Sequence, residues 1–260
     1  MNHFEVPEDL IHKVASGYEG AEREFFVRVW GGGIGVYGAR LDAIGFQGMA
    51  NVLECGFGMG TWLFALAQRN TFVEGIDYDP RHIATAQQMI TALDLGERVR
   101  VQQGTVESLP YPDASFDAVF CYGALFATDA RRSLGEMRRV LKPGGRVYFT
   151  SNGLGWFLHM LLDEEGTTAG YVPRDVAIRA LANTLDYLGR GVHHPGAHLA
   201  IPPAVMRSWL AADFDEVRSG PEGSLHEPGS PAPSSFYQFS EAHGQDAVYE
   251  VLARRISSPA

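Results

Sequence analysis

Cysteine is scarce in this chain, with only two among 260 residues. So few thiols exclude a disulfide framework, and we expect Cys55 and Cys121, at the ends of apolar runs, to be buried reduced thiols. The first residues lack the basic and apolar regions of a signal peptide, and no apolar run reaches the about 18 residues of a membrane span. The sequence therefore predicts a cytoplasmic protein without a membrane partner.

Basic residues are also few. Lys and Arg number 21 against 31 Asp and Glu, a net charge of −10, and the longest basic runs are pairs such as Arg131-Arg132. Non-specific nucleic-acid binding needs cations that neutralise phosphates, so this balance disfavours a nucleic-acid partner. Neither a CxxC pair nor an HExxH sequence occurs, so no metal site is expected.

Apolar runs alternate with amphipathic stretches through the middle of the chain, as in a parallel sheet covered on both faces. A length of 260 residues, 45% hydrophobic, suits one large α/β domain, residues 1–260. The expected strands are 51–55, 72–77, 99–103, 116–121 and 145–150. The expected helices between them are 61–69, 80–93 and 130–140, the second begun by an Asp79 cap and Pro80, the third ended by Lys142–Gly145.

The alternation breaks between residues 151 and 203. Helices are expected there at 156–163 and 174–188, so this stretch is an insertion. Regular alternation resumes with a helix at 203–212 and strands at 214–219 and 247–254. The intervening 220–244 holds four of the 14 prolines and is expected to be a long loop, of the kind that is usually functional or mobile.

The glycines of Asn51–Gly60 follow a strand and open a helix, a unit that binds adenosine-containing cofactors. Dinucleotide-binding turns have the spacing GxGxxG, whereas here Gly56, Gly58 and Gly60 place the third glycine one residue early. Glu54 at the strand end would repel a pyrophosphate, and Asp77 ends the next strand. These charges favour a cofactor with a ribose and an ammonium but no phosphate, such as S-adenosylmethionine.

Five segments then carry a family resemblance. Val52–Gly60 resembles the first motif of class I S-adenosylmethionine-dependent methyltransferases, and Gly75–Pro80 resembles the second. Later motifs of the family are similar, in order, to Gly104–Tyr111, Ser115–Val119 and Glu136–Gly145. The resemblance covers about residues 50–150 and implies a doubly wound, mostly parallel seven-stranded sheet whose last strand, 247–254, is antiparallel.

The N-terminal segment is similar to the entry segment of the glycine/sarcosine and ubiquinone-biosynthesis methyltransferases. The similarity covers Tyr18–Phe26 and Val29–Tyr37, although a histidine that this group carries after the tryptophan is absent. It implies that residues 1–45 cover the methionine end of the cofactor, with Tyr18 and Trp30 in the binding site.

The resemblance also implies roles for residues at the ends of the strands. The glycine turn lets the backbone approach the cofactor, and Asp77 accepts the ribose hydroxyls with its two oxygens. Glu54 lies near the ammonium, and Tyr78 packs on the adenine. Thr105 stands where this group commonly has an aspartate, but its hydroxyl can still bond the ring. The remaining cofactor candidates are Val106 and Cys121.

The acceptor side is expected at the end of the fourth strand. Cys121–Ala124 lacks the Asn/Asp-Pro-Pro-aromatic motif of enzymes that methylate base amino groups, and it lacks the aspartate of metal-dependent catechol enzymes. The insertion 151–203 is expected to be a helical substrate lid. His159 is expected in its core, and the general-base candidates are His193, His194, His198 and Tyr122.

The sequence thus predicts an S-adenosylmethionine-dependent methyltransferase acting on O, N or C of a small molecule of metabolism or natural-product assembly. One alternative is a methyltransferase of RNA or protein, and another is a protein that binds the cofactor without transferring methyl. The expected partner is a small-molecule acceptor, with a homodimer left open. An apolar acceptor pocket would be formed by Tyr18, Phe26, Trp30, Tyr122, Trp156 and Phe157.

Overall fold

A seven-stranded sheet forms the centre of the computed structural model, which describes residues 4–164 and 171–257. The strand order is β3-β2-β1-β4-β5-β9-β6, and every pairing is parallel except those that β9 makes with β5 and β6. The predicted doubly wound sheet is confirmed. Its strands are β1 (Asn51–Cys55), β2 (Phe72–Asp77), β3 (Val99–Gln103), β4 (Phe116–Cys121), β5 (Leu141–Asn152), β6 (Phe214–Pro221) and β9 (Val248–Arg255).

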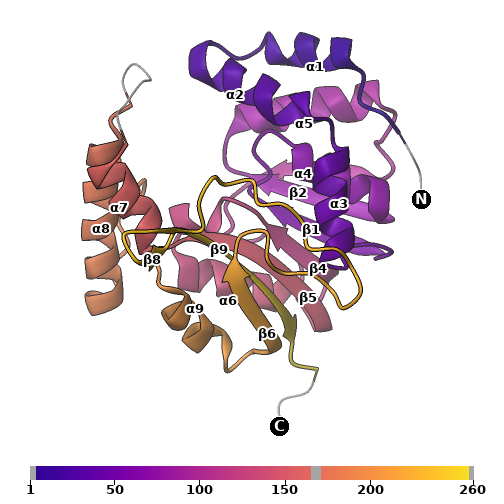
Figure 1. The fold of residues 1–260 in the computed structure, drawn as a ribbon. Coiled ribbons are helices and arrows are strands. Elements are labelled where there is room, and N and C mark those ends of the chain that lie inside the picture. The colour runs from indigo at the N-terminus through magenta and orange to yellow at the C-terminus, as the bar shows by residue number, and fades with distance from the viewer. Residues whose placement is uncertain (1–3, 165–170, 258–260) are drawn as a thin grey trace.

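Helices surround this sheet, with the N-terminal helices at the top and right of Figure 1 and α7 and α8 at the left. Their bounds are α1 (Glu8–Ala15), α2 (Gly20–Gly31), α3 (Gly35–Ala43), α4 (Thr61–Arg69), α5 (Pro80–Ala92), η1 (Leu125–Ala127), α6 (Ala130–Val140), α7 (Leu154–Leu162), α8 (Pro173–Arg190) and α9 (Pro203–Leu210). A short hairpin joins β7 (Glu241–Ala242) to β8 (Gln245–Asp246). No helix of the described ranges is both long and apolar enough to cross a membrane.

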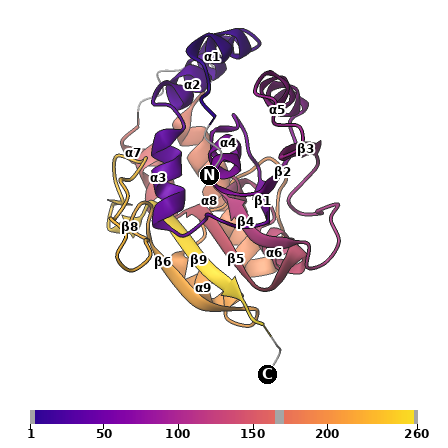
Figure 2. The ribbon, with the colours of Figure 1, turned by 90° about the vertical axis from the view of Figure 1, so that its right-hand side faces the viewer.

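Both faces of the sheet are buried, which is why its strands are apolar throughout. Successive side chains of a strand point to opposite faces. Val52 therefore packs with the cluster of α1 to α5, and Leu53 with that of α6 and α9. Figure 2 shows the two helix groups on either side of the strands.

Local signals place several element ends where the sequence predicted them. The Asp79 side chain accepts a hydrogen bond from the Arg81 N–H at 2.8 Å, and Pro80 follows it as the first residue of α5. The end of α6 at Val140 is also confirmed. However, β5 begins at Leu141 rather than residue 145, because Leu141 pairs with Phe116 before the register shifts. The expected turn at Lys142–Gly145 is therefore an irregular part of this strand.

The remaining differences are mostly small. The two helices expected at 156–163 and 174–188 are α7 and α8, each moved or lengthened by one or two residues. Residues 165–170 of the expected lid lie outside the described residues. The larger omission was the N-terminal region, which folds into three helices that the apolar pattern did not reveal.

A buried ion cluster attaches the 220–244 segment and α3 to the sheet. Arg40 of α3 lies 2.8 Å from Oε1 of Glu222 and 2.9 Å from Oε2 of Glu250, and all three side chains are at most 1% exposed. Tyr148 of β5 donates a hydrogen bond to Glu250 at 2.6 Å. One cation therefore holds together two carboxylates from distant parts of the chain.

We expect Arg40→Met to destabilise the fold by about 3–5 kcal/mol, because it leaves two carboxylates buried without a counter-ion. Arg190→Met is the matched control, since Arg190 pairs with Asp186 at the surface and exposed pairs contribute little. Urea unfolding measures both variants. Equal midpoints for the two would contradict the role given to Arg40.

Candidate cofactor and acceptor site

The glycine turn between β1 and α4 has the backbone shape that only glycine adopts readily. Gly56, Gly58 and Gly60 have φ angles of 71°, 50° and 84°, in the left-handed region that penalises other residues. A Cβ at Gly56 would also lie 2.5 Å from the Cβ of Ala124, beyond β4. The turn therefore brings backbone N–H groups to the carboxyl edge of the sheet, where ligands bind in such folds.

Asp77, the last residue of β2, fastens this turn. Its Oδ2 accepts a hydrogen bond from the Gly58 N–H at 2.8 Å, and its Oδ1 accepts one from the Asp79 N–H at 2.9 Å. His82 lies 3.1 Å from Oδ1. Burial disfavours the charged imidazole and lowers its pKa. The hydrogen bond to Asp77 and the negative charge of that carboxylate outweigh burial, so the pKa of His82 is raised. Since each carboxylate oxygen has two acceptor positions, these three contacts leave Asp77 of the free protein one position, on Oδ2, for a ribose hydroxyl.

Glu54 is the unsatisfied group of the site. It is 1% exposed, and its Oε2 has no hydrogen-bond partner among the described residues. Burial and the nearby charge of Asp77 raise the pKa of Glu54 well above its ordinary value. A buried carboxylate is costly unless it is paired, so an ammonium would be stabilised here. This donor set fits S-adenosylmethionine, which has an ammonium and a ribose.

Two aromatic residues of the N-terminal segment are buried near this edge. Trp30 of α2 donates from Nε1 to the Met59 carbonyl within the glycine turn at 3.0 Å. The Tyr18 hydroxyl instead pairs with Thr85 of α5 at 2.8 Å, and its ring stacks on Phe26. The structure therefore brings Trp30 to the turn and connects Tyr18 to the helix that follows Asp77.

The adenine candidates have different surroundings. Tyr78 is 74% exposed, beside Asp77. Thr105 is exposed and bridges to Ser108 after β3, whereas Val106 is buried in the core. Cys55 and Cys121 are free and fully buried, and burial raises the Cys121 pKa to about 12. Cys121 is therefore a neutral thiol of the core beneath the site.

Tyr122, a member of the predicted acceptor pocket, follows β4 and lies in an aromatic group whose other members the sequence did not predict. Its hydroxyl donates to Oε1 of Glu222 at 3.0 Å, and its ring centroid is 4.7 Å from that of Trp62. Burial and the charge of Glu222 raise the pKa of Tyr122 well above the ordinary value, so it is a proton donor. Phe236 completes this aromatic group. Its ring centroid lies 5.3 Å from that of Tyr37 and 5.7 Å from that of Trp62.

The segment 222–240 supplies this covering by crossing from α3 to α7. The Glu227 N–H donates to the Ala43 carbonyl at the end of α3. Further on, Tyr237 and Phe239 pack on Trp156 of α7 at 5.5 and 5.7 Å. Figure 1 shows this crossing as the gold trace in front of the strands. Only the aromatic content of an otherwise turn-rich loop could have indicated this role from sequence.

The three histidines of the expected lid do not lie together at the site. His194 pairs with Asp186 of α8 at 2.8 Å, and His193 packs on Tyr187 of the same helix. His198 instead packs edge-on against Phe126 of η1 at 4.9 Å, close to the end of β4. Burial lowers the His198 pKa, which favours the neutral imidazole that a general base requires.

His159 was expected in the core but is 31% exposed, and it pairs with Asp163 at 3.2 Å. The described residues contain no group of three or more His, Cys, Asp or Glu side chains able to hold a metal.

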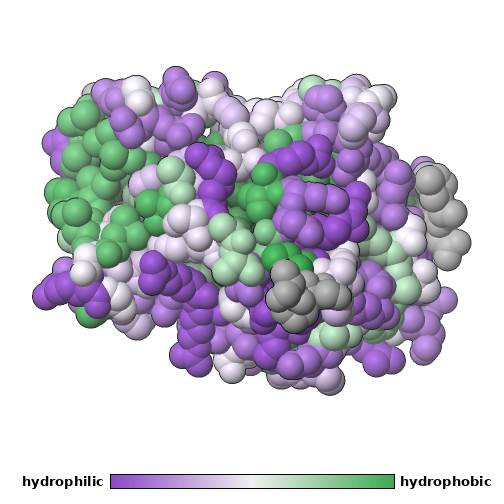
Figure 3. Space-filling model, turned by 90° about the horizontal axis from the view of Figure 1, so that it is seen from below, coloured by the Kyte–Doolittle hydropathy of each residue, from purple (hydrophilic) through white to green (hydrophobic). Residues whose placement is uncertain are grey.

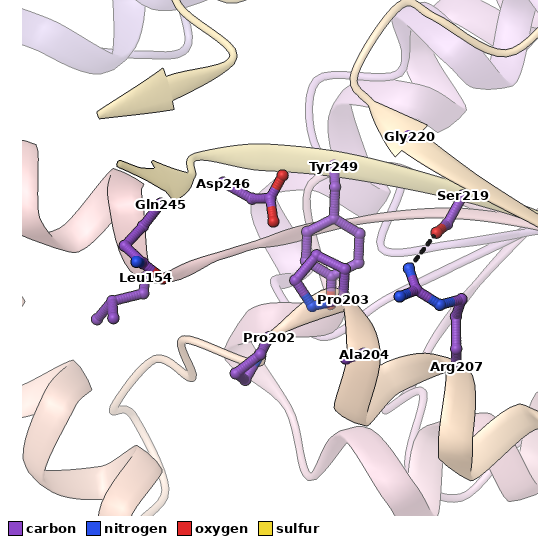
Figure 4. A pocket seen from close by; sticks show the side chains of 10 residues that line it. All are labelled: Leu154, Pro202, Pro203, Ala204, Arg207, Ser219, Gly220, Gln245, Asp246 and Tyr249. Carbon is purple, nitrogen blue, oxygen red and sulfur yellow. Dashed lines mark hydrogen bonds between the residues drawn. The ribbon is translucent and has the colours of Figure 1, made fainter. Parts of the chain in front are cut away.

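A cavity of about 300 Å³ lies near the end of β6, at the other side of the sheet from the glycine turn. It is bounded by α9, β6 and the β8–β9 turn (Figure 4). Arg207 and Ser219 hydrogen-bond across it at 2.9 Å, and Tyr249 lies in its middle. No residue predicted for the site lines this cavity.

Comparison with known proteins supports the assignment of the glycine turn. Residues 52–145 match the family model described as a methyltransferase domain. This region belongs to that family. The predicted resemblance to S-adenosylmethionine-dependent methyltransferases is confirmed, and with it the cofactor class.

The similar curated proteins are matched only in part. A demethylmenaquinone methyltransferase of Deinococcus radiodurans is 41% identical over 37% of this chain and 40% of its own length. An uncharacterized methyltransferase of Bacillus subtilis is 38% identical over 53% of this chain and 47% of its own length. The chain thus spans less than half the length of these relatives.

Solved structures resemble the fold over almost the whole chain. A methyltransferase from Thermotoga maritima has a TM-score of 0.54 at 20% identity, covering 94% of this chain and 99% of its own. A [4+2]-cyclase, SpnF, has a TM-score of 0.57 at 18% identity, covering 96% and 94%. At such identities the likeness establishes the fold alone.

We expect Asp77→Ala to weaken S-adenosylmethionine binding at least about tenfold, because it removes both the candidate ribose acceptor and the hydrogen bond to the Gly58 N–H of the glycine turn. Isothermal titration calorimetry measures the affinity. Asp113→Ala is the control, since Asp113 is 78% exposed and lies outside the site. Unchanged affinity in Asp77→Ala would refute the assignment.

Glu54 should make cofactor affinity depend on pH. Because the pKa of its carboxyl is raised in the free protein and an ammonium favours the ionised form, affinity should rise as increasing pH ionises Glu54. Glu54→Gln should bind more weakly and lose this dependence. The same rise with pH in Glu54→Gln would assign it to another group.

Proposed function

We propose that this protein transfers a methyl group from S-adenosylmethionine to a small aromatic acceptor. The observation that carries the proposal is the buried Glu54 carboxyl group beside the glycine turn and Asp77, whose Oε2 has no hydrogen-bond partner in the described part of the chain, an arrangement suited to a cation with a ribose. The acceptor class follows from the covering aromatic group of Tyr37, Trp62, Tyr122 and Phe236, because aromatic rings pack well with one another.

The relatives support an aromatic acceptor as well. One similar protein bears the name demethylmenaquinone methyltransferase, and another bears the name ubiquinone/menaquinone biosynthesis C-methyltransferase. In this proposal such a planar ring would lie between the glycine turn and the 222–240 segment. Acceptor oxygen or nitrogen on an aromatic ring would fit the same covering.

In this proposal the chain's own residues mainly bind and orient the two reactants. When bound, the cofactor supplies a methyl group on a sulfonium, which is already a good leaving group. Glu54 holds the ammonium, Asp77 holds the ribose, and Trp30 keeps the glycine turn in place. Orientation of two reactants can contribute roughly 7–11 kcal/mol of the barrier, so fixing these groups is a large part of catalysis.

Tyr122 and His198 have different tasks on the acceptor side. The Tyr122 hydroxyl donates a hydrogen bond to Glu222. This bond fixes the orientation of the ring, which would line the acceptor site. His198, neutral because of burial, is the histidine best placed to accept a proton from an acceptor hydroxyl or activated carbon.

Methyl transfer itself is tested by the release of S-adenosylhomocysteine and the appearance of labelled methyl on the acceptor. We expect turnover with a short-chain demethylmenaquinone in reduced form or with simple phenols and aromatic amines. Labelled methyl on bulk RNA or on protein instead would favour a macromolecular substrate. Cofactor binding without turnover on any of these would favour a protein that only binds, or a different reaction such as that named for SpnF.

The base assignment predicts a difference between two histidines. His198→Ala should lower kcat by about 100-fold or more, within the usual range for a general base. His194→Ala should leave kcat unchanged, because His194 is 54% exposed and pairs with Asp186 of α8. Since the His198 pKa is lowered, the wild-type kcat should fall with acid only below the ordinary histidine range. Equal rates for both variants would remove His198 from the mechanism.

A further inference from the structure

An exposed apolar stripe runs along the outer face of α8. Its members follow one another at intervals of three and four residues, so they lie on one side of the helix. Three are strongly exposed, with Ile178 at 52%, Leu185 at 75% and Leu188 at 41%, and Leu181 between them is half-buried. Val192, 44% exposed, continues the stripe just beyond the helix.

Of these side chains only Leu181 packs in part against the buried face of α8. Ala177 and Ala180 pack into a cluster with Phe157 and Met160 of α7, and Tyr187 packs into the core beneath α9. The helix thus already buries one face and presents a second apolar face to solvent. A helix apolar on two sides needs a partner on the second.

The exposed patch is large for a monomer. Leu162, Tyr171 and Val172, at the adjoining ends of α7 and α8, are 57%, 42% and 51% exposed and extend the stripe. Figure 3 shows apolar surface gathered at the left edge of the molecule, the side on which α8 lies in Figure 1. Seven apolar side chains of this region are thus more than 40% exposed, whereas large apolar side chains on a monomer surface are usually scattered singly.

We propose that α8 pairs antiparallel with α8 of a second copy of this chain across a two-fold axis. Such a pairing places Leu181 opposite Leu185 of the second copy, and Ile178 opposite Leu188, so the stripe is complementary to itself. Ala182 and Gly189 flank the stripe, and side chains this small let two helices approach closely. A single helix pair buries less than the about 800 Å² per partner of a standard interface, so the dimer is expected to be weak.

Charge favours this occupant over a lipid surface. The charged residues around the stripe are Arg174 and Arg190 against Asp175 and Asp186, a balanced set. Helices that lie on membranes instead carry a predominantly basic polar face. The chain's net charge of −10 would further repel an anionic bilayer, whereas it weakens an apolar contact between two copies only modestly.

Sedimentation velocity of the full chain tests the pairing. We expect reversible dimers between about 1 and 100 µM, since a single helix pair makes a small interface. Leu185→Glu should raise the protein concentration at which half of the chains are dimeric by at least about tenfold. Val36→Glu is the matched control, because Val36 of α3 is 49% exposed and distant in sequence from the stripe, and it should leave that concentration unchanged.

Crosslinking tests the geometry. The native cysteines are fully buried, so a new surface thiol is the one a short bifunctional thiol reagent reaches. Ala182→Cys, beside the two-fold axis, should crosslink to a second copy. Arg179→Cys, exposed on the side of α8 turned away from the stripe, should crosslink at least about tenfold less.

Several results would overturn the proposal. These are a monomer at every concentration, a dimer that Val36→Glu weakens as much as Leu185→Glu does, or equal crosslinking of both cysteine variants. A monomer that cosediments with phosphatidylcholine vesicles through the stripe would identify lipid as the occupant instead. None of these measurements depends on methyl transfer, so they stand apart from the test of the proposed function.

Discussion

The hydrogen bond between the Gly58 N–H and the Asp77 carboxylate is the contact on which the site depends. It joins the glycine turn after β1 to the end of β2, two segments that neighbouring parallel strands bring to one edge of the sheet. The same carboxylate organises the start of α5 through the Asp79 N–H and His82. Asp77 is therefore both a structural junction and the ribose acceptor of the proposed site.

Glu54 belongs to β1, and neither of the two strands beside β1 gives its side chain a hydrogen-bond partner. Its neighbours in the sheet are Gly75 of β2 and Phe120 of β4, which offer its side chain no counter-charge. Folding therefore leaves a buried carboxyl with a raised pKa close to Asp77. A cationic ligand relieves that cost, so the energetic penalty of the free protein becomes affinity for the cofactor.

Much of this arrangement could be predicted because it is local. The strands 51–55, 72–77, 99–103 and 116–121 and the helix 130–140 have the bounds that the sequence predicted, since apolar runs and caps act over a few residues. The family resemblance placed Glu54, Asp77 and the glycine turn at one sheet edge for the same reason.

The covering of the proposed acceptor side could not be predicted because it is assembled across long sequence separations. Arg40 contacts Glu222 and Glu250, and Phe236 reaches Tyr37 and Trp62, although no periodic pattern links these positions. The three lid histidines likewise form no local motif, and only packing against η1 distinguishes His198 from His193 and His194. Such contacts follow from the tertiary path of the 222–240 segment.

A crystal structure of the chain with S-adenosylhomocysteine tests the central claim most directly. We predict the ligand's amino group within hydrogen-bond distance of Glu54 and its ribose hydroxyls on Asp77, beside the glycine turn. A ligand bound in the cavity at α9, or elsewhere with Glu54 still unpartnered, would contradict the account.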